Sequence, residues 1–248
     1  MSEQIPVRTF GGPTALIEYG GLRLLVDPTF DDPGDYPMGE GLVLSKTAGP
    51  TAVPAELGRI DAVLLSHDQH PDNLDRSGRA LLAEVPLTLT TPTGADRLGG
   101  TARGMTPWQT VTLDRPGGGT VTAAPALHGP EGAEELTGEV TGFILTADGL
   151  PTVYISGDNA SLRLVREIAD RTGPVDTAVL FAGAARTPFF DGATVTLDSA
   201  QAAEATRILG ARRVVPVHFD SWGHFTEGRE PLLAAFTAAG LADRLHLV

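Results

Sequence analysis

Val63-Leu64-Leu65-Ser66-His67-Asp68-Gln69-His70-Pro71-Asp72-Asn73-Leu74-Asp75 is the stretch that decides how this chain is organised. Its apolar start, Val63 to Leu65, predicts a short buried strand. His67 follows that strand, and α/β folds place ligands and chemistry at the carboxyl ends of strands. Because Pro71 disfavours the α conformation for His70, we expect both histidines on one tight loop. Imidazoles and carboxylates crowded on such a loop suit a divalent metal ion.

The same loop has a simpler interpretation as a polar turn. Asp72 or Asn73 would then cap a helix expected from residue 74 to 84. For Asp72 the two roles are compatible, because a carboxylate at the start of a helix can also face a neighbouring site.

The bulk properties describe an ordinary globular protein. The 248 residues, 42% of them hydrophobic, fit a single domain spanning residues 1–248. No apolar run approaches the roughly 18 residues of a membrane span, and the first residues lack the pattern of a signal peptide. The absence of cysteine excludes disulfides, thiolate metal sites and cysteine nucleophiles. A cytoplasmic location is the default expectation.

The charge of the chain restricts its partners. The net charge is −13, and Lys46 is the only lysine. Binding a nucleic acid requires clustered basic residues that neutralise phosphates, so we expect no nucleic-acid partner, and a nuclease of the same fold is a less favoured third function. A small-molecule substrate remains the expected partner, with no membrane contact and with a homo-oligomer left open.

The first part of the chain predicts a β-meander followed by a flap. Runs at 7–10, 14–19 and 22–26 have strand character and are separated by paired glycines. Residues 31–54 are rich in Gly, Pro and Asp and show little periodicity. Unstructured loops of that length in compact domains are usually functional, so we expect a mobile flap over the site.

The rest of the chain alternates between strands and helices. Helices are expected at 74–84, 93–98, 162–172, 198–209 and 230–239, with Asp198 as an N-cap. Strands are expected at 61–66, 87–91, 110–113, 120–126, 138–146, 152–156, 177–181, 213–217 and 245–248, with a turn at 114–117. This order predicts an α/β (α+β) fold with two sheets and helices outside them.

Polar residues repeatedly follow the predicted strands. Four of the six histidines and one aspartate lie just beyond an apolar run: His67, His70, His128, His218 and Asp158. A single histidine at a strand end is most often structural. Five such residues together predict a metal centre assembled at one edge of the sheets.

Several of these segments resemble one known family. They are Thr14-Ala15-Leu16-Ile17-Glu18, Leu24-Leu25-Val26-Asp27-Pro28, Ser66-His67, Pro125-Ala126-Leu127-His128, Ile155-Ser156-Gly157-Asp158 and Val215-Pro216-Val217-His218-Phe219. Together they resemble the metallo-β-lactamase superfamily, in particular the branch similar to ascorbate-6-phosphate lactonase. The resemblance implies an αββα sandwich of two mixed β-sheets flanked by helices. It also implies one or two divalent ions (zinc, with manganese or iron as alternatives) and hydrolysis by a metal-activated hydroxide.

The central motif departs from the usual pattern His-x-His-x-Asp-His. It is one residue longer here, and Asn73 stands where the last histidine would fall. With one inserted residue, the resemblance implies a first metal site of His67, His70 and His128. It implies a second site of Asp72, Asp158 and His218, with Asp158 bridging the two. Without an insertion, Asp68 would take the first ligand position.

Asn73 also affects how many metal ions we expect. An amide oxygen is a weaker ligand for zinc than imidazole, so we expect a weakened second site. One tightly held ion, or a harder ion such as Mn²⁺ in the second position, is favoured over two equal zinc ions.

The resemblance implies that Asp72 orients the hydroxide and carries its proton to the leaving group. His224 and Trp222 follow His218 on a rim loop, where they would contact substrate or stabilise an oxyanion. Trp222 could instead pack under the last helix. Arg186 is a candidate anion contact, or else a partner for a surface acid. His246 is assigned no role.

Two functions from different classes remain. The first is a metal-dependent hydrolase of a small ester, lactone or phosphoester. The second is a ligand-binding protein of the same fold with a degenerate metal site and no turnover, which Asn73 and the altered spacing favour. Because one fold hosts many activities, the sequence leaves the substrate open.

Overall fold

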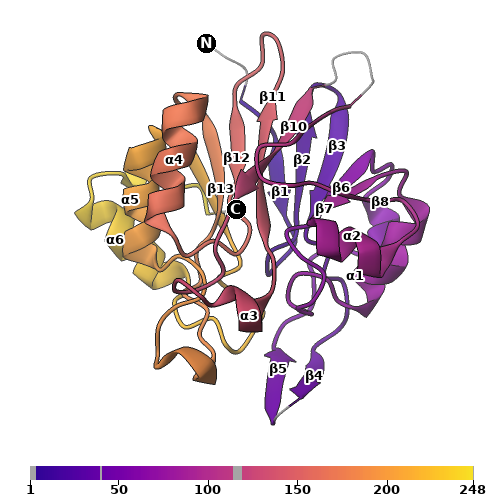
Figure 1. Ribbon diagram of the computed structural model, residues 1–248. Coiled ribbons are helices and arrows are strands. Elements are labelled where there is room, and N and C mark those ends of the chain that lie inside the picture. The colour runs from indigo at the N-terminus through magenta and orange to yellow at the C-terminus, as the bar shows by residue number, and fades with distance from the viewer. Residues whose placement is uncertain (1–3, 40, 114–118, 248) are drawn as a thin grey trace.

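The computed structural model describes residues 4–39, 41–113 and 119–247. Two six-stranded sheets pack against each other, and helices cover the outer face of each sheet (Figure 1). This is the predicted αββα sandwich, so the fold prediction is confirmed. In the described part of the chain, no helix has the length and apolar character needed to cross a membrane.

The first sheet has the strand order β1-β2-β3-β6-β7-β8. β1 to β3 form the expected antiparallel meander, and β3, β6, β7 and β8 are parallel. Helices α1 and α2 lie on its outer face (Figure 1). The bounds of these elements are β1 Val7–Thr9, β2 Ala15–Tyr19, β3 Leu22–Val26, β6 Ala62–Leu64, β7 Thr88–Thr90, β8 Ala102–Gly104, α1 Arg76–Leu81 and α2 Pro92–Leu98.

The second sheet has the order β14-β13-β12-β11-β10-β9. β12, β13 and β14 are parallel, and the other pairs are antiparallel. Helices α4, α5 and α6 cover it (Figure 1). The bounds are β9 Thr110–Thr112, β10 Thr120–Pro125, β11 Thr141–Thr146, β12 Val153–Ile155, β13 Thr177–Phe181, β14 Arg213–Val217, α3 Glu134–Thr137, α4 Leu162–Thr172, α5 Ser199–Leu209 and α6 Arg229–Ala238.

The main core fills the space between the sheets. Leu24 of β3, Leu64 of β6 and Phe143 of β11 belong to one fully buried cluster. All residues of β6 and β13 are buried, because helices cover the face of each sheet that does not meet the other sheet. Their continuous apolar sequences reflect this burial on both faces.

The structure corrects two local predictions and adds one strand. Helix α1 is capped by Asp75, whose Oδ1 accepts the Gly78 N–H at 2.8 Å, so neither Asp72 nor Asn73 is the cap. The predicted last strand is reduced, in its described residues, to one bridge between Leu245 and Val214. Strand β8 was not predicted. The turn expected at 114–117 lies outside the described residues.

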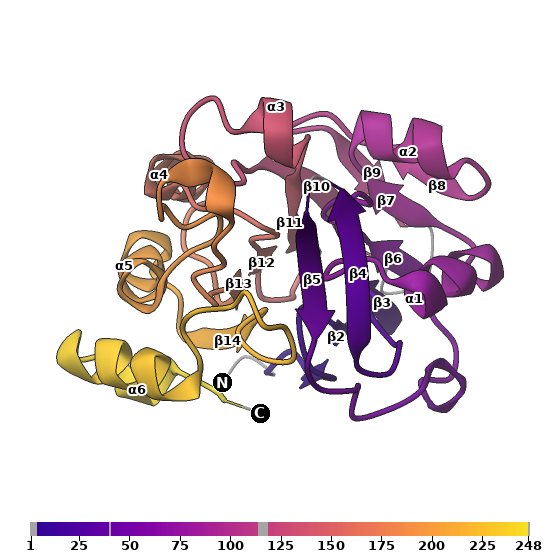
Figure 2. The same ribbon diagram turned by 90° about the horizontal axis from the view of Figure 1, so that it is seen from below.

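Part of the segment 31–54 is a β-hairpin instead of an irregular loop. β4 (Gly34–Gly39) pairs antiparallel with β5 (Leu42–Lys46), and we call residues 34–46 the flap hairpin. It projects below the two sheets in Figure 1, and seen from below it lies across the middle of the molecule (Figure 2). Tyr36 and Leu44 pack on Trp222 in a small separate core.

The base of the flap hairpin is tied to the start of α1. The Lys46 Nζ lies 3.0 Å from Asp75 Oδ2, and the exposed fractions of the two side chains are 2% and 0%. The same Asp75 oxygen accepts the backbone N–H of Asp31. Asp31 in turn accepts hydrogen bonds from Tyr36 and Ser77.

The buried pair makes a prediction for stability. Lys46→Met removes one partner and leaves the Asp75 carboxylate buried without its cation, which costs about 3–5 kcal/mol. The matched control is Arg171→Met, which breaks the exposed pair between Arg171 and Glu167 on α4 and should cost about 0–1 kcal/mol. Urea unfolding measures both. Equal losses in the two variants would contradict the structural role given to Lys46.

Candidate metal centre

Five chain segments bring polar side chains to the same edge of the sandwich. Strands β3, β6, β10, β12 and β14 all end there. The side chains that follow them are Asp27, His67, His128, Asp158 and His218, all buried. They come from both sheets, so the site exists only when the two sheets are packed together.

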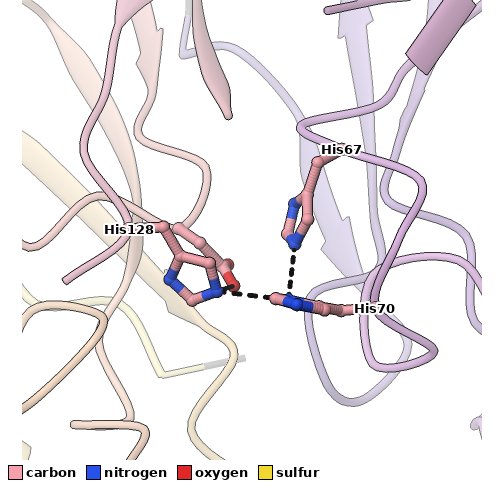
Figure 3. A group of neighbouring side chains, drawn as sticks. His67, His70 and His128 are labelled. Carbon is pink, nitrogen blue, oxygen red and sulfur yellow. Dashed lines mark hydrogen bonds and ion pairs between the residues drawn. The ribbon is translucent and has the colours of Figure 1, made fainter. Parts of the chain in front are cut away.

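The first group contains the three histidines of the predicted first site and Asp158. The rings of His67, His70 and His128 point toward one another, with His128 reaching in from the opposite side (Figure 3). His70 Nδ1 lies 2.8 Å from His67 Nε2 and 3.2 Å from His128 Nε2. One ligand atom from each of the four residues lies within 4.8 Å of all the others.

Hydrogen bonds behind the rings decide where the imidazole lone pairs point. The Ser66 hydroxyl donates to Asp27 Oδ2 at 2.5 Å and lies 3.0 Å from His67 Nδ1. Its only proton is used on Asp27, so Ser66 must accept from His67 Nδ1–H. The His128 Nδ1 lies 2.7 Å from the carbonyl oxygen of Val195, which can only accept. In the neutral state that a metal ligand requires, both histidines therefore turn an unprotonated Nε2 inward.

This arrangement fits a divalent cation. Burial lowers the pKa of His67 well below its ordinary value and lowers that of His70 to about 4, so these rings are neutral, as metal ligands must be. His70 Nδ1 faces two lone pairs and has at most one proton to share. Asp158 Oδ2 is buried, has no hydrogen-bond donor among the described residues and lies 3.3 Å from His128 Nε2.

The second group shares Asp158 with the first. Asp72, Asp158 and His218 offer ligand atoms within 4.8 Å of one another. His218 Nε2 lies 3.2 Å from Asp72 Oδ2 and 3.4 Å from Asp158 Oδ1. Burial opposes a charged His218 ring, but the carboxylates of Asp158 and Asp72 prevail and raise its pKa. The second predicted ligand set is thus brought together as well.

His224 lies against Asp72. Its Nε2 is 3.0 Å from Asp72 Oδ2, and its side chain is 14% exposed. Burial alone would raise the pKa of Asp72, but the charge of His224 and hydrogen bonds from His218 and His224 hold it well below its ordinary value. Asp72 is therefore a charged acceptor with two imidazole neighbours.

Asn73 is buried and does not present its oxygen to Asp158. Its Nδ2 lies 3.0 Å from Asp27 Oδ2 and 3.1 Å from Asp158 Oδ1. Carboxylate oxygens only accept, so this orientation of the amide follows from its partners. Burial raises the pKa of Asp27 to about 7, against the hydrogen bonds from Asn73 and Ser66. The Asn73 side chain therefore places a hydrogen-bond donor next to Asp158, and not an oxygen that could bind a metal ion.

Three candidates from the sequence lie outside both groups. The Asp68 carboxylate pairs with Arg97 at 2.5 Å and with Arg79 at 3.8 Å, so the alignment that makes Asp68 a ligand has no geometric support. Trp222 is buried, with its ring centroid 5.3 Å from that of Tyr36. It packs under the flap hairpin, not under the last helix.

Arg186 supports a loop. Its Nη1 donates to the carbonyl of Gly192 and its Nε to Thr226. Its neighbours Ala185 and Thr187 line the cavity at the site, and Arg186 does not. The Arg186 guanidinium is therefore hydrogen-bonded within this loop, and its predicted contact with a substrate anion has no geometric support.

Sequence reasoning gave no role to Asp27 and Ser66. Both carry the signal that singled out the histidines, a polar residue just past an apolar strand. Their task, to orient the His67 ring, is visible only in three dimensions.

The backbone at the site is unusual as well. Asp27 (φ 35°) and His218 (φ 58°) hold left-handed backbone conformations. Such conformations are costly away from glycine and collect at functional sites. Gly157 is required, because a Cβ there would lie 2.5 Å from the Thr141 carbonyl oxygen.

A cavity of about 270 Å³ opens onto both groups. His70, Asp72, His128 and His224 are its titratable lining residues. The remaining lining residues are Met38, Gly39, Leu42, Leu44, Leu136, Thr137, Ala185, Thr187, Phe189, Phe190 and Val195.

Comparison with known protein families identifies the superfamily of this chain. The pattern of the Beta-lactamase superfamily domain matches residues 22–219 of this chain. The chain belongs to the metallo-β-lactamase superfamily. The matched range contains Asp27 and both ligand groups and ends before His224. Membership of this superfamily, inferred from the strand-end residues, is thereby confirmed.

Members of the superfamily and solved structures are similar over nearly the whole chain. A UPF0173 metal-dependent hydrolase from Methanosphaerula palustris is 28% identical over 221 residues, with 86% of this chain and 84% of that protein covered. The isothiocyanate hydrolase from Delia radicum gut bacteria superposes with a TM-score of 0.81 at 20% identity, covering 96% and 94% of the two chains. A possible metal-dependent hydrolase from Veillonella parvula gives 0.82 at 17% identity, covering 99% and 97%.

The hydroxyl of Ser66 gives a prediction for metal affinity. Ser66→Ala frees His67 Nδ1 from its acceptor, so the affinity for zinc should fall about 10–100-fold. Competition with a fluorescent chelator measures the change. Ser45→Ala is the matched control, because it also removes a hydroxyl that donates to a carboxylate, that of the exposed Asp35. Unchanged zinc affinity in Ser66→Ala would contradict the orientation inferred for His67.

Proposed function

We propose that this chain, a metal-dependent hydrolase of the metallo-β-lactamase superfamily, cleaves a small ester, lactone or phosphoester. The observation that carries the proposal is the position of the cavity. Its floor exposes His70, Asp72, His128 and His224, which belong to or adjoin the two ligand groups. A substrate in this cavity would meet the metal ligands and Asp72 at the same time.

We further propose that one divalent ion is held tightly, by His67, His70, His128 and Asp158. Zinc suits this donor set, and manganese or iron are alternatives. When bound, such an ion polarises the substrate carbonyl or phosphoryl oxygen and lowers the pKa of water toward about 7. The Asn73 amide donates to Asp158 Oδ1, the oxygen nearest to His218, and this supports a second position that is weak.

Asp72 and His224 have separate tasks in this mechanism. Asp72 is held as a carboxylate and lines the cavity, where it orients the attacking water and takes up its proton. The His224 ring is hydrogen-bonded to Asp72 Oδ2 and also lines the cavity. It is placed to pass a proton to the leaving oxygen. His218, deeper and fully buried, holds Asp72 in position.

Ligand binding without turnover is the second candidate. The observation that favours it is Asn73, which stands where the resemblance implies a histidine ligand. Its amide N–H groups donate to Asp27 and Asp158. In that case the cavity would bind a small molecule, and Asp72 would have no catalytic task.

A hydrolysis screen separates the two candidates. Protein prepared without chelator, and loaded with Zn²⁺, Mn²⁺ or Fe²⁺, should cleave at least one of a set of p-nitrophenyl esters, lactones and phosphodiesters. Asp72→Asn should lower kcat about 10²–10⁴-fold and leave metal content unchanged. Asp243→Asn, an exposed aspartate after α6, is the control. Metal-loaded protein that cleaves none of these compounds would favour the binding role.

Metal content tests the role of Asn73. The wild-type protein should hold about one ion per chain, and Asn73→His should hold about two because the new imidazole adds a ligand. Asn73→Ala removes the amide without adding a ligand and should stay near one. Elemental analysis after gel filtration gives the counts. Two ions in the wild-type protein would refute the single-ion assignment.

A further inference from the structure

We propose that the cavity selects an uncharged substrate with an apolar acyl or ring substituent, and hence an ester or lactone over a phosphoester. This rests on the proposed function, because the reacting bond is placed at the ligand groups. The inference concerns what the walls and the charges of the site recognise beyond that bond.

The walls of the cavity are apolar and come from three separate segments. Leu42 and Leu44 are contributed by the flap hairpin, Leu136 by α3, and Phe189 and Phe190 by the short 3-10 helix Pro188–Phe190. About 270 Å³ of space lies between them, near the lower end of the range for small-molecule sites. A group of a few carbon atoms fills such a space and loses its contact with water there.

The apolar surface continues out to the rim. Leu136 is 64% exposed and Phe189 is 45% exposed, and both line the cavity. These are two of the five exposed large hydrophobic residues in the described part of the chain. Apolar side chains gathered at one opening, and not scattered singly, mark a binding surface.

Among the described lining residues there is no lysine or arginine. The two cations that lie nearest in sequence to wall segments have other partners. Lys46, at the end of β5, is paired with Asp75, and Arg186 donates to the Gly192 carbonyl. A phosphate or carboxylate on the substrate would therefore enter the cavity without a guanidinium or ammonium to replace its hydration.

The charge of the chain also disfavours an anion. The chain as a whole carries a net charge of −13, which repels anions that approach. A neutral substrate avoids both penalties, and its apolar part gains from the walls.

The aromatic wall is preorganised. The Thr187 hydroxyl accepts the N–H of Phe189 at the start of the 3-10 helix. At the other end of this loop, Arg186 Nη1 donates to the Gly192 carbonyl oxygen, and the Arg186 backbone forms a β-bridge with Thr194. The wall therefore does not have to be ordered at the moment of binding, which lowers the entropic cost of taking up the substituent.

A matched pair of esters tests the inference in the metal-loaded enzyme. p-Nitrophenyl pentanoate and p-nitrophenyl glutarate have acyl chains of the same carbon number, and only the second ends in a carboxylate. We expect kcat/KM to be at least tenfold higher for pentanoate. Along the series from acetate to pentanoate, kcat/KM should rise by about two- to fourfold per methylene, as burial of each CH₂ predicts. A preference for glutarate, or a flat series, would overturn the inference.

A charge placed on the wall supplies the second test. Leu136→Arg adds a cation at the rim, on an exposed position that tolerates it, and should raise the glutarate-to-pentanoate ratio at least tenfold. Leu233→Arg makes the same change on an exposed leucine of α6, outside the cavity lining, and should leave the ratio unchanged. If Leu136→Arg also leaves it unchanged, the cavity does not hold the acyl chain.

Binding separates the two proposals. The p-nitroanilides of pentanoate and glutarate present the same chains on a bond that resists cleavage, and calorimetry measures their affinity for the wild-type protein. At least tenfold tighter binding of the pentanoate anilide supports the apolar cavity even if no ester is cleaved, an outcome that would count against the proposed hydrolase alone. Equal or reversed affinities overturn the inference while leaving any observed hydrolysis intact.

Discussion

Three imidazole rings meet at one buried point between the sheets, and the rest of the site is arranged around this contact. Two of them, His67 and His128, have their protons committed to Ser66 and to the Val195 carbonyl, so their lone pairs face inward with nothing between them but His70. A cation relieves this repulsion. The acceptors behind the rings belong to the scaffold: Ser66 is oriented by Asp27, which follows β3, and Val195 precedes α5. The electronic state of the ligands is therefore set by how the two sheets and their connections are packed.

Much of the fold could be predicted from the sequence because it depends on local pattern. β13 and α4 were predicted with their observed bounds, since one is a continuous apolar run and the other an amphipathic segment that ends at Gly173. The ligand groups could also be predicted, because strands that run in the same direction end at the same edge. Asp158 and His218 therefore meet although 60 positions separate them in the sequence. The division of these residues into two metal-ligand groups came from the resemblance to the family, and not from the strand pattern.

What the sequence did not reveal depends on contacts between distant segments. The chain from Asp27 through Ser66 to His67 joins β3 to β6, and no periodicity marks a hydrogen bond of that kind. The flap hairpin was taken for an irregular loop because its glycines and prolines obscure the alternation that places Tyr36 and Leu44 against Trp222. The apolar cavity was missed because its walls come from segments that are distant in the sequence. Leu136 and Phe189 each look like ordinary surface residues in the sequence, and only the fold brings them to the same cavity.

The burial of Lys46 has a practical consequence. This ammonium is the only lysine side chain in the sequence, and it is enclosed by Asp75 and the Trp222 ring. While the hairpin rests on the sheets, an amine-directed reagent finds no accessible side chain to acylate. An opening of the hairpin would expose the nucleophile, so the rate of covalent tagging at this one position would measure how often the hairpin opens. Lys46 is therefore a single-site chemical probe of access to the cavity.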